Sequence, residues 1–456
     1  MKKIGMLTLA VVLAMTLGAS VVNAQLGQTD NASFRVMNLS TSTAHVQITF
    51  YDEAGTAYTP TTLNMGKPNP FDLPAGTSFE VYLPGIPSGL PNGRYSVVIS
   101  SDQPVVATAN LVGADGTTTY YNGAYSGVSA GATTYYLPAV YHNYYGWNDI
   151  ISVQNVGSAA TNIEVKYYQG STMVATHTKS ALAAGASVHF DLKTSVPPGM
   201  PPSFGGSAVV TSTSQPIVVV NNQRATGGFT QSYNGFASGA NTIYVPALYS
   251  TFYTWNSSLF VQNVGAANTD VHVVYTDGKT RDVTLAPKQS VQWEEWDGKH
   301  APGISVGATI TTTGQPVVAV ANAANPARQA QTYSAFITGG TKVVLPTIMK
   351  NYWGWDTSFT VMNIGTANAT VTVTYAPDSE HGFGGANYNI TVNAGSSHQI
   401  YVPGDSNVTV ANYGGSVTLS TSTPGALLIA TCDETYGAGQ AAGTGDWSMS
   451  YNGFAQ

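Results

Sequence analysis

The chain has 456 residues, of which 43% are hydrophobic and 9% are charged, and its formal net charge is −7. So large a hydrophobic fraction excludes a disordered chain, and the acidic balance argues against a nucleic-acid partner, which would need a basic face. Cys432 is the single cysteine, so intrachain disulfides are excluded as well.

The N-terminus predicts a secretory signal peptide over residues 1–24. Lys2 and Lys3 form a short basic region, residues 7–17 form a mostly apolar run, and small residues lead to a cleavage site at Ala24. The apolar run is too short to span a membrane. We therefore expect a mature chain that begins at residue 25, has no membrane span, and is secreted to an extracellular or cell-surface location.

A 27-residue block occurs three times without insertion or deletion, at residues 131–157, 239–265 and 339–365. Each copy holds a Leu-Pro or Val-Pro pair, then an aromatic cluster, then a Trp nine residues after the Pro and an Asn eight residues after the Trp. Such fixed spacing indicates one structural unit that has been copied.

Other landmarks extend the repeat to four copies. Short apolar segments end at Asn38, Asn155, Asn263 and Asn363, and each is followed by a turn and then by a segment in which apolar and polar residues alternate. This alternation predicts strands with one buried face. A turn that ends in proline recurs once in each copy, at Pro104, Pro216, Pro316 and Pro424.

About seven short strands in roughly 100 residues are typical of an Ig-like antiparallel sandwich, whereas a propeller blade would be about half as long. The sequence therefore predicts an all-β protein, a tandem array of four Ig-like antiparallel β-sandwich domains over residues 25–130, 131–238, 239–338 and 339–456. The block, with its Pro, aromatic cluster and Trp followed by a Val-x-Asn-x-Gly or similar turn, resembles modules of secreted bacterial surface proteins built from tandem Ig-like β-sandwich repeats. The resemblance implies an architecture and leaves the activity open.

No set of residues predicts catalysis, a metal site or a cofactor, so we expect a protein that is not an enzyme. The densest acidic segment contains Glu294, Glu295 and Asp297. It is interpreted as a solvated loop, with a weak calcium site as the alternative. His189 and Asp191 are interpreted as neighbours on one strand face rather than as metal ligands.

The aromatic clusters of the three blocks are the candidate interdomain joint or binding surface. Aromatic rings at these positions could seal the contact between repeats, or they could present a flat platform to sugar rings or to a neighbouring chain. The residues are Tyr144, Tyr145, Trp147, Phe252, Tyr253, Trp255, Tyr352, Trp353 and Trp355.

Three blocks for four repeats imply that one terminal repeat lacks a strand. If the segment before the Trp completes the preceding sandwich, the last repeat is incomplete, and if it opens the following sandwich, the first repeat is incomplete. An unpaired edge is a template for another chain. The alternative is a terminal repeat that serves as a cap.

These features predict an exported, non-enzymatic structural protein of the cell surface or extracellular matrix that self-assembles into filaments or a layer through the incomplete repeat. The expected partners are further copies of the chain or another surface protein. The alternative function is an adhesin or carbohydrate-binding repeat array, with polysaccharide as the partner of the Tyr and Trp surfaces. A passive stalk would have nearly the same sequence.

Overall fold

A computed structural model describes residues 11–17, 29–114, 120–226, 228–327, 329–437 and 446–456. Lys2, Lys3 and Ala24 of the predicted signal peptide lie outside the described residues. The described residues form eight antiparallel sheets of four or five strands, which confirms an all-β protein with a repeated β-sandwich architecture. They contain no helix that is long and apolar enough to cross a membrane.

The strands follow one another in the same order in each repeat. Those of the first repeat and of the segment before it are β1 (Val11–Leu17), β2 (Thr29–Asn38), β3 (Ala44–Asp52), β4 (Ala57–Tyr58), β5 (Phe71–Leu73), β6 (Ser78–Tyr82), β7 (Tyr95–Ser101), β8 (Val105–Ala114) and β9 (Tyr120–Ser126). Those of the second are β10 (Thr134–His142), β11 (Trp147–Asn155), β12 (Thr161–Gln169), β13 (Thr172–Leu182), β14 (Ser187–Asp191), β15 (Phe204–Ser212), β16 (Ile217–Ala225) and β17 (Thr230–Asn234).

The same order continues in the second half of the chain. The third repeat contains β18 (Thr242–Ser250), β19 (Asn256–Asn263), β20 (Thr269–Tyr275), β21 (Thr280–Leu285), β22 (Ser290–Glu294), β23 (Ile304–Thr312), β24 (Val317–Ala324) and β25 (Ala330–Ser334). The fourth contains β26 (Lys342–Lys350), β27 (Trp355–Asn363), β28 (Ala369–Tyr375), β29 (Ala386–Val392), β30 (Ser397–Tyr401), β31 (Tyr413–Ser420), β32 (Leu428–Tyr436), β33 (Ser448–Asn452) and β34 (Phe454–Ala455). Short 3-10 helices are η1 (Asn64–Gly66), η2 (Leu83–Gly85) and η3 (Val402–Gly404).

Each repeat contributes two sheets with a common strand order. In the second repeat these are β10-β15-β12-β13 and β14-β11-β16-β17, and the third and fourth repeats follow the same scheme. Alternation along the strands explains the packing, since β20 is alternately buried and exposed from end to end. The described residues form four large hydrophobic cores, one for each pair of sheets.

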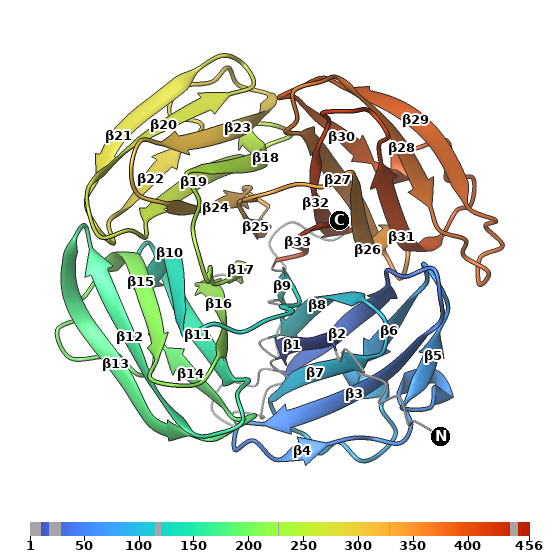
Figure 1. The fold of residues 1–456 in the computed structure, drawn as a ribbon, viewed down its shortest axis with the longest axis horizontal. Coiled ribbons are helices and arrows are strands. Elements are labelled where there is room, and N and C mark those ends of the chain that lie inside the picture. Colours follow the sequence, from blue (N-terminus) through green and yellow to red (C-terminus); the bar gives the residue numbers. More distant parts are fainter. Residues whose placement is uncertain (1–10, 18–28, 115–119, 227, 328, 438–445) are drawn as a thin grey trace, which may run out of the picture.

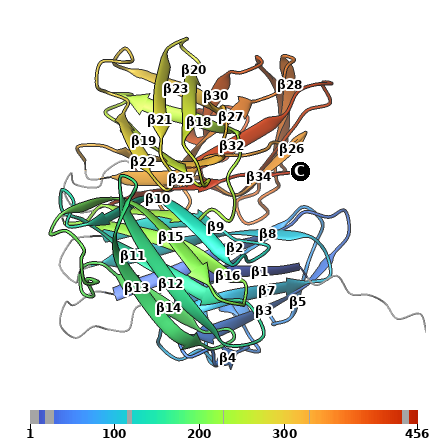
Figure 2. The same cartoon turned by 60° about the vertical axis from the view of Figure 1, so that its left-hand side comes forward.

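The four repeats form a closed ring (Figure 1). The last strands β9, β17, β25 and β33 lie around its centre, and each of them contacts the next, including β33 with β9. Figure 2 shows the third and fourth repeats (yellow to red) on one side of the ring and the first and second on the other. The repeats therefore do not form an extended array. Local sequence patterns do not encode the rotation from one repeat to the next, so they could not show this closure.

The Asn landmark ties the turn after the second strand to the opposite sheet. The amide of Asn155 donates to the carbonyl oxygens of Ala159 at 2.8 Å and Leu182 at 3.0 Å, and its Oδ1 accepts from the N–H of Gly157 at 2.9 Å. The equivalent bonds recur at Asn38, Asn263 and Asn363. A fully buried amide needs these partners, which explains why Asn recurs at this position.

The Pro of the block lies in a β-bulge. The register of β10 against β15 shifts between Leu137 and Val140, and the same shift recurs in β18 and β26. Proline has no N–H to donate, so a bulge accommodates it. The carbonyl of Pro138 accepts from Ser290 Oγ of the next repeat at 2.6 Å. The carbonyl of Pro246 likewise accepts from Ser397 Oγ at 2.7 Å.

The block opens the repeat that follows it, because its first strand belongs to a sheet of that repeat. The fourth repeat therefore has its first strand, β26, and the first repeat is the one without a block. The structure places β1 in the position of the missing strand, where it pairs with β7 from Val11 opposite Ser101 to Leu17 opposite Tyr95 (Figures 1 and 2). This segment lies within the predicted signal peptide.

Candidate binding surfaces between the repeats

Each aromatic cluster forms a tight hairpin between the first and second strands of its repeat. Tyr144 and Trp147 exchange two backbone hydrogen bonds of 3.1 and 2.9 Å, and the same pairs form at Phe252 with Trp255 and at Tyr352 with Trp355. Two residues lie between the paired residues. Both have positive φ in every copy, as a two-residue type I′ turn requires.

The first residue of each turn is an exposed aromatic. Tyr145, Tyr253 and Trp353 have φ of 50°, 46° and 51°, and 88%, 82% and 79% of their surfaces are exposed. Positive φ is uncommon for bulky side chains, and strain of this kind concentrates at functional sites. Each ring packs edge-on against the aromatic residue before it and is otherwise open to solvent. We call these three residues the tip aromatics.

The other six candidate residues are partly buried at the boundaries between repeats. The ring of Tyr144 stacks on buried Tyr141 with centroids 5.6 Å apart and an angle of 8°, and Phe252 stacks on Tyr249 at 5.6 Å and 11°. Tyr141 in turn packs edge-on against Phe260 of the third repeat. The structure thus divides the predicted cluster into partly buried rings, whose ring contacts lie within their own repeats, and tips that face solvent.

A groove of about 340 Å³ lies between the second and third repeats. Its aromatic lining comes mainly from the second repeat, with Tyr141, Tyr144, Tyr145 and Trp147, and the third repeat adds Phe260 and Trp296. The opposite side carries amide and hydroxyl groups of the third repeat, including Asn256, Ser258, Gln292 and Asn322.

A larger groove of about 700 Å³ lies at the corresponding place between the third and fourth repeats. Its aromatic wall is formed by Tyr249, Phe252, Tyr253 and Trp255, and the fourth repeat adds Tyr401 and Tyr436. Corresponding positions line both grooves. Asp356, Ser358, Gln399 and Asp433 stand where the smaller groove has Asn256, Ser258, Gln292 and Asn322.

Asp433 is a buried carboxylate in the larger groove. Its oxygens accept hydrogen bonds from Ser450 Oγ at 2.6 Å and from Tyr249 OH at 3.0 Å. Burial raises the pKa of Asp433 to about 6, although these donors oppose the shift. Asn322 holds this position in the smaller groove and accepts from Thr332 Oγ1 at 2.6 Å. The two grooves therefore share a geometry, and the larger one has carboxylates at Asp356 and Asp433 where the smaller one has amides.

At the boundary between the fourth and first repeats, Glu434 is fully buried and accepts from the amide of Asn110 at 2.9 Å. Burial and the nearby carboxylate of Glu80 raise the pKa of Glu434 to about 8. Arg35 pairs with Glu80 at 3.0 Å on the same boundary. Neither Asp433 nor Glu434 was singled out from the sequence, because nothing local distinguishes them from solvent-facing strand residues.

The remaining boundary, between the first and second repeats, is formed by other residues. Ser96 and Ser187 are linked there by a hydrogen bond of 3.2 Å, and Glu53 lies 3.5 Å from both Arg94 and His189. Burial, together with the charge of Arg94, lowers the pKa of His189 to about 3. His189 bonds to Ser152 Oγ, whereas Asp191 accepts from the backbone N–H of Lys193 and so stabilises a turn.

The acidic segment at 294–297 is bound internally. Glu295 is fully buried and accepts from Tyr275 OH at 2.9 Å, His300 lies 3.1 Å from its other oxygen, and Asp297 pairs with Arg281 at 2.9 Å. These partners use the oxygens that a cation would need. Within the described ranges, no group of three or more His, Cys, Asp and Glu side chains is arranged to hold a metal ion.

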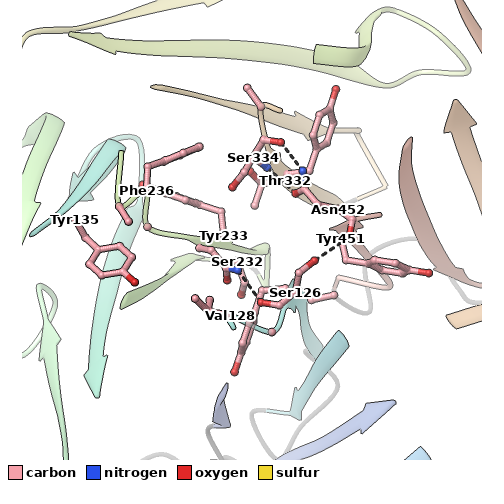
Figure 3. Close-up of a pocket in the computed structure, with 18 of the residues that line it drawn as sticks. Ser126, Val128, Tyr135, Ser232, Tyr233, Phe236, Thr332, Ser334, Tyr451 and Asn452 are labelled. Atoms are coloured by element: carbon pink, nitrogen blue, oxygen red, sulfur yellow. Dashed lines mark hydrogen bonds between the residues drawn. The ribbon is translucent and has the colours of Figure 1, made fainter. Parts of the chain in front are cut away.

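A further cavity of about 390 Å³ lies near the centre of the ring, where the last strands of the four repeats meet (Figure 3). Its lining is neutral. The amide of Asn234 donates to the carbonyl of Ser126 at 2.6 Å, that of Asn452 donates to the carbonyl of Ser334 at 2.6 Å, and Ser126 Oγ donates to the carbonyl of Asn452 at 2.9 Å. These bonds join the four strands across the cavity, so we interpret it as part of the joint.

Asp446 also joins the repeats. Its carboxylate is fully buried and accepts from the backbone N–H groups of Thr230 at 2.7 Å, Ala330 at 2.9 Å and Ser448 at 3.1 Å. These donors belong to the second, third and fourth repeats, at the beginnings of their last strands. The side chain of Asn122 in the first repeat donates to the Asp446 carbonyl. One residue therefore contacts all four repeats.

No protein-family model matches the chain, and no curated protein matches it. A solved structure described as "Crystal Structure of Thermotoga maritima 1070" has 16% sequence identity to this chain and a TM-score of 0.20. The similarity covers 22% of this chain and 94% of that chain.

Proposed function

We propose that the protein is an exported, non-enzymatic protein of the cell surface or extracellular matrix, whose four Ig-like β-sandwich domains bind polysaccharide in the grooves of a ring. One observation carries this proposal. In three successive copies, a turn with positive φ holds an aromatic side chain in solvent, and in two of them it stands beside a groove lined by amides and hydroxyls, to which the larger groove adds the carboxyl groups of Asp356 and Asp433.

The chemistry of the grooves suits a neutral sugar. An exposed aromatic face can stack on the apolar face of a sugar ring, while amides and hydroxyls can hydrogen-bond its hydroxyl groups. Lysine and arginine together number only 16 in the chain, which disfavours a strongly anionic polymer. Repeated sites on one rigid ring would bind a polymer with an avidity above that of each site.

The structural role predicted from the sequence is the second candidate. A closed ring has no unlike ends of the kind that an open head-to-tail array would use for polymerisation. The first repeat, however, obtains its first strand from the predicted signal peptide. Self-assembly would therefore depend on whether the position of this first strand is filled or open after the signal peptide is removed.

The test is binding of the signal-free chain, residues 25–456, to a panel of neutral and acidic polysaccharides by affinity electrophoresis. The tip variant Tyr145→Ala/Tyr253→Ala/Trp353→Ala should lose at least tenfold in affinity for the neutral polymer that binds. The matched control is Met173→Ala, which removes an exposed apolar side chain from β13. Equal retardation of the tip variant and the control would contradict the proposal.

A further inference from the structure

The first strand of each repeat occupies one position in the ring. β10 pairs with β15 of its own repeat and contacts β19 and β24 of the next. β18 contacts β27 and β32 in the same way, and β26 contacts β2 and β8. β1 pairs with β7 and contacts β11 and β16 of the second repeat. A first strand thus lies at every boundary of the ring.

The register of β1 is that of the block strands. Met15 lies opposite Val97 in β7, as Leu137 of the block lies opposite Ala208 in β15. Val97 and Ala208 are equivalent because each also pairs with the buried aromatic residue of the adjacent strand, Phe50 and Tyr167 respectively. The edge of β7 that β1 pairs with therefore corresponds to the edge that a block strand pairs with in the other repeats, and we call it the β7 slot.

Cleavage after Ala24 would remove the strand that fills this slot. In the second repeat the first strand runs from Thr134 to His142 and ends five residues before Trp147 begins the next strand. The residues left ahead of β2 would be 25–28, and so short a segment cannot turn back and run along β7. The slot is filled in the full chain and open in the processed one.

We propose that the open β7 slot binds an extended strand of a different protein, and that this strand closes the boundary between the first and second repeats. This inference rests on the proposed export and cleavage. Unpaired strand edges bind added strands through backbone hydrogen bonds, and side-chain pockets give selectivity. A second copy is disfavoured as the donor, because β10, β18 and β26 are each paired within their own repeat.

The block strands indicate the chemistry of the donor. Tyr135, Leu137 and Val140 of β10 are buried, and Pro138 lies in the bulge between them. Ile243, Val245 and Leu248 of β18 are buried in the same pattern. The expected donor is an uncharged segment of about nine residues with apolar side chains at these positions and a proline near its middle.

The test titrates the chain 25–456 with a synthetic peptide that has the sequence of β18, residues 242–250. We expect binding in a 1:1 ratio by isothermal titration calorimetry and a rise in melting temperature. A peptide with Ile243→Asp and Val245→Asp is the matched control and should not bind. In a second control, residues 239–255 are joined ahead of residue 31, so that the slot is filled within the chain and should not bind the peptide.

Two results would overturn the inference. The first is that the peptide does not bind to the chain 25–456 and that this chain melts at the same temperature as the variant carrying residues 239–255. The second is multimers of the chain 25–456 that the peptide does not disperse, since they would make a second copy the donor. Polysaccharide binding is a separate measurement, and N-terminal sequencing of the exported protein tests cleavage independently of both.

Discussion

The hydroxyl group of Tyr249 in the third repeat donates a 3.0 Å hydrogen bond to the buried carboxylate of Asp433 in the fourth. The corresponding residues in the preceding groove are Tyr141 and Asn322, so the tyrosine faces an amide there and a carboxyl group in the larger groove. This difference, together with buried Glu434, should make the stability of the ring depend on pH.

Asp433 and Glu434 should make stability fall as the pH rises from about 4 to about 8. Their folded pKa values are about 6 and about 8, above the ordinary values of 3.8 and 4.5, so at these two groups the folded state binds more protons than the unfolded state. His189 opposes this fall below about pH 6.5, because its folded pKa of about 3 lies under the ordinary value of 6.5, and above that pH its opposition ends. Urea unfolding of the chain at several pH values measures this slope.

The double variant Asp433→Asn/Glu434→Gln should flatten the dependence, because neither amide titrates. Asp149 and Asp446 are also fully buried and have raised pKa values, so they should leave a residual slope of the same sign. A slope in the double variant equal to that of the parent chain would show that other groups dominate.

Tyr249→Phe should be more destabilising than Tyr141→Phe. The first change removes one of the donors to a buried acid, which should cost about 1.5–3 kcal/mol when that acid is ionised, whereas a neutral hydrogen bond contributes about 0.5–1.5 kcal/mol. Both variants keep the aromatic ring and its stacking on the hairpin. Denaturant unfolding above pH 7 compares the two variants. The difference between their losses of unfolding free energy should become smaller below pH 5.

Thr254→Gly should stabilise the protein by up to about 1 kcal/mol. Thr254 has φ of 72°, a conformation that costs a residue with a Cβ about 1–2 kcal/mol and that glycine adopts freely. Gly146 and Gly354 hold this position in the other hairpins, with φ of 84° each. The reverse change, Gly146→Thr, should lower the melting temperature, and a rise in that variant would exclude strain as the cause.

Asp446→Ala should weaken the centre of the ring more than Asp446→Asn. Alanine leaves the N–H groups of Thr230 and Ala330 without their acceptor, and each unsatisfied buried group costs about 1–3 kcal/mol. The Asp446→Asn variant keeps one acceptor oxygen, so it should lose about half as much stability as Asp446→Ala. Hydrogen exchange at the beginnings of β17 and β25 should report the loss locally, and unchanged protection in Asp446→Ala would contradict it.

Much of the local structure could be predicted from the sequence. The alternation in residues 46–50 and in the equivalent segments predicts strands that the structure contains, because side chains on a strand face opposite sides at every step. The recurring Asn and Pro were recognised as landmarks, although only the structure shows the bonds that they make. The equivalence of Tyr125 and Tyr233 is visible only in the structure, where Tyr125 lies opposite Ala109 as Tyr233 lies opposite Asn221.

By itself, the sequence determined the β class, the repeat, the position of the aromatic clusters and the absence of one block. These features depend on spacing within one repeat, which the chain carries locally. Only the tertiary structure decided that the ring closes, that Tyr145 is exposed while Tyr144 is partly buried, and that the first repeat is the incomplete one. Those outcomes depend on contacts between residues of different repeats, such as Asn110 with Glu434 and Thr230 with Asp446, and a local pattern does not specify them.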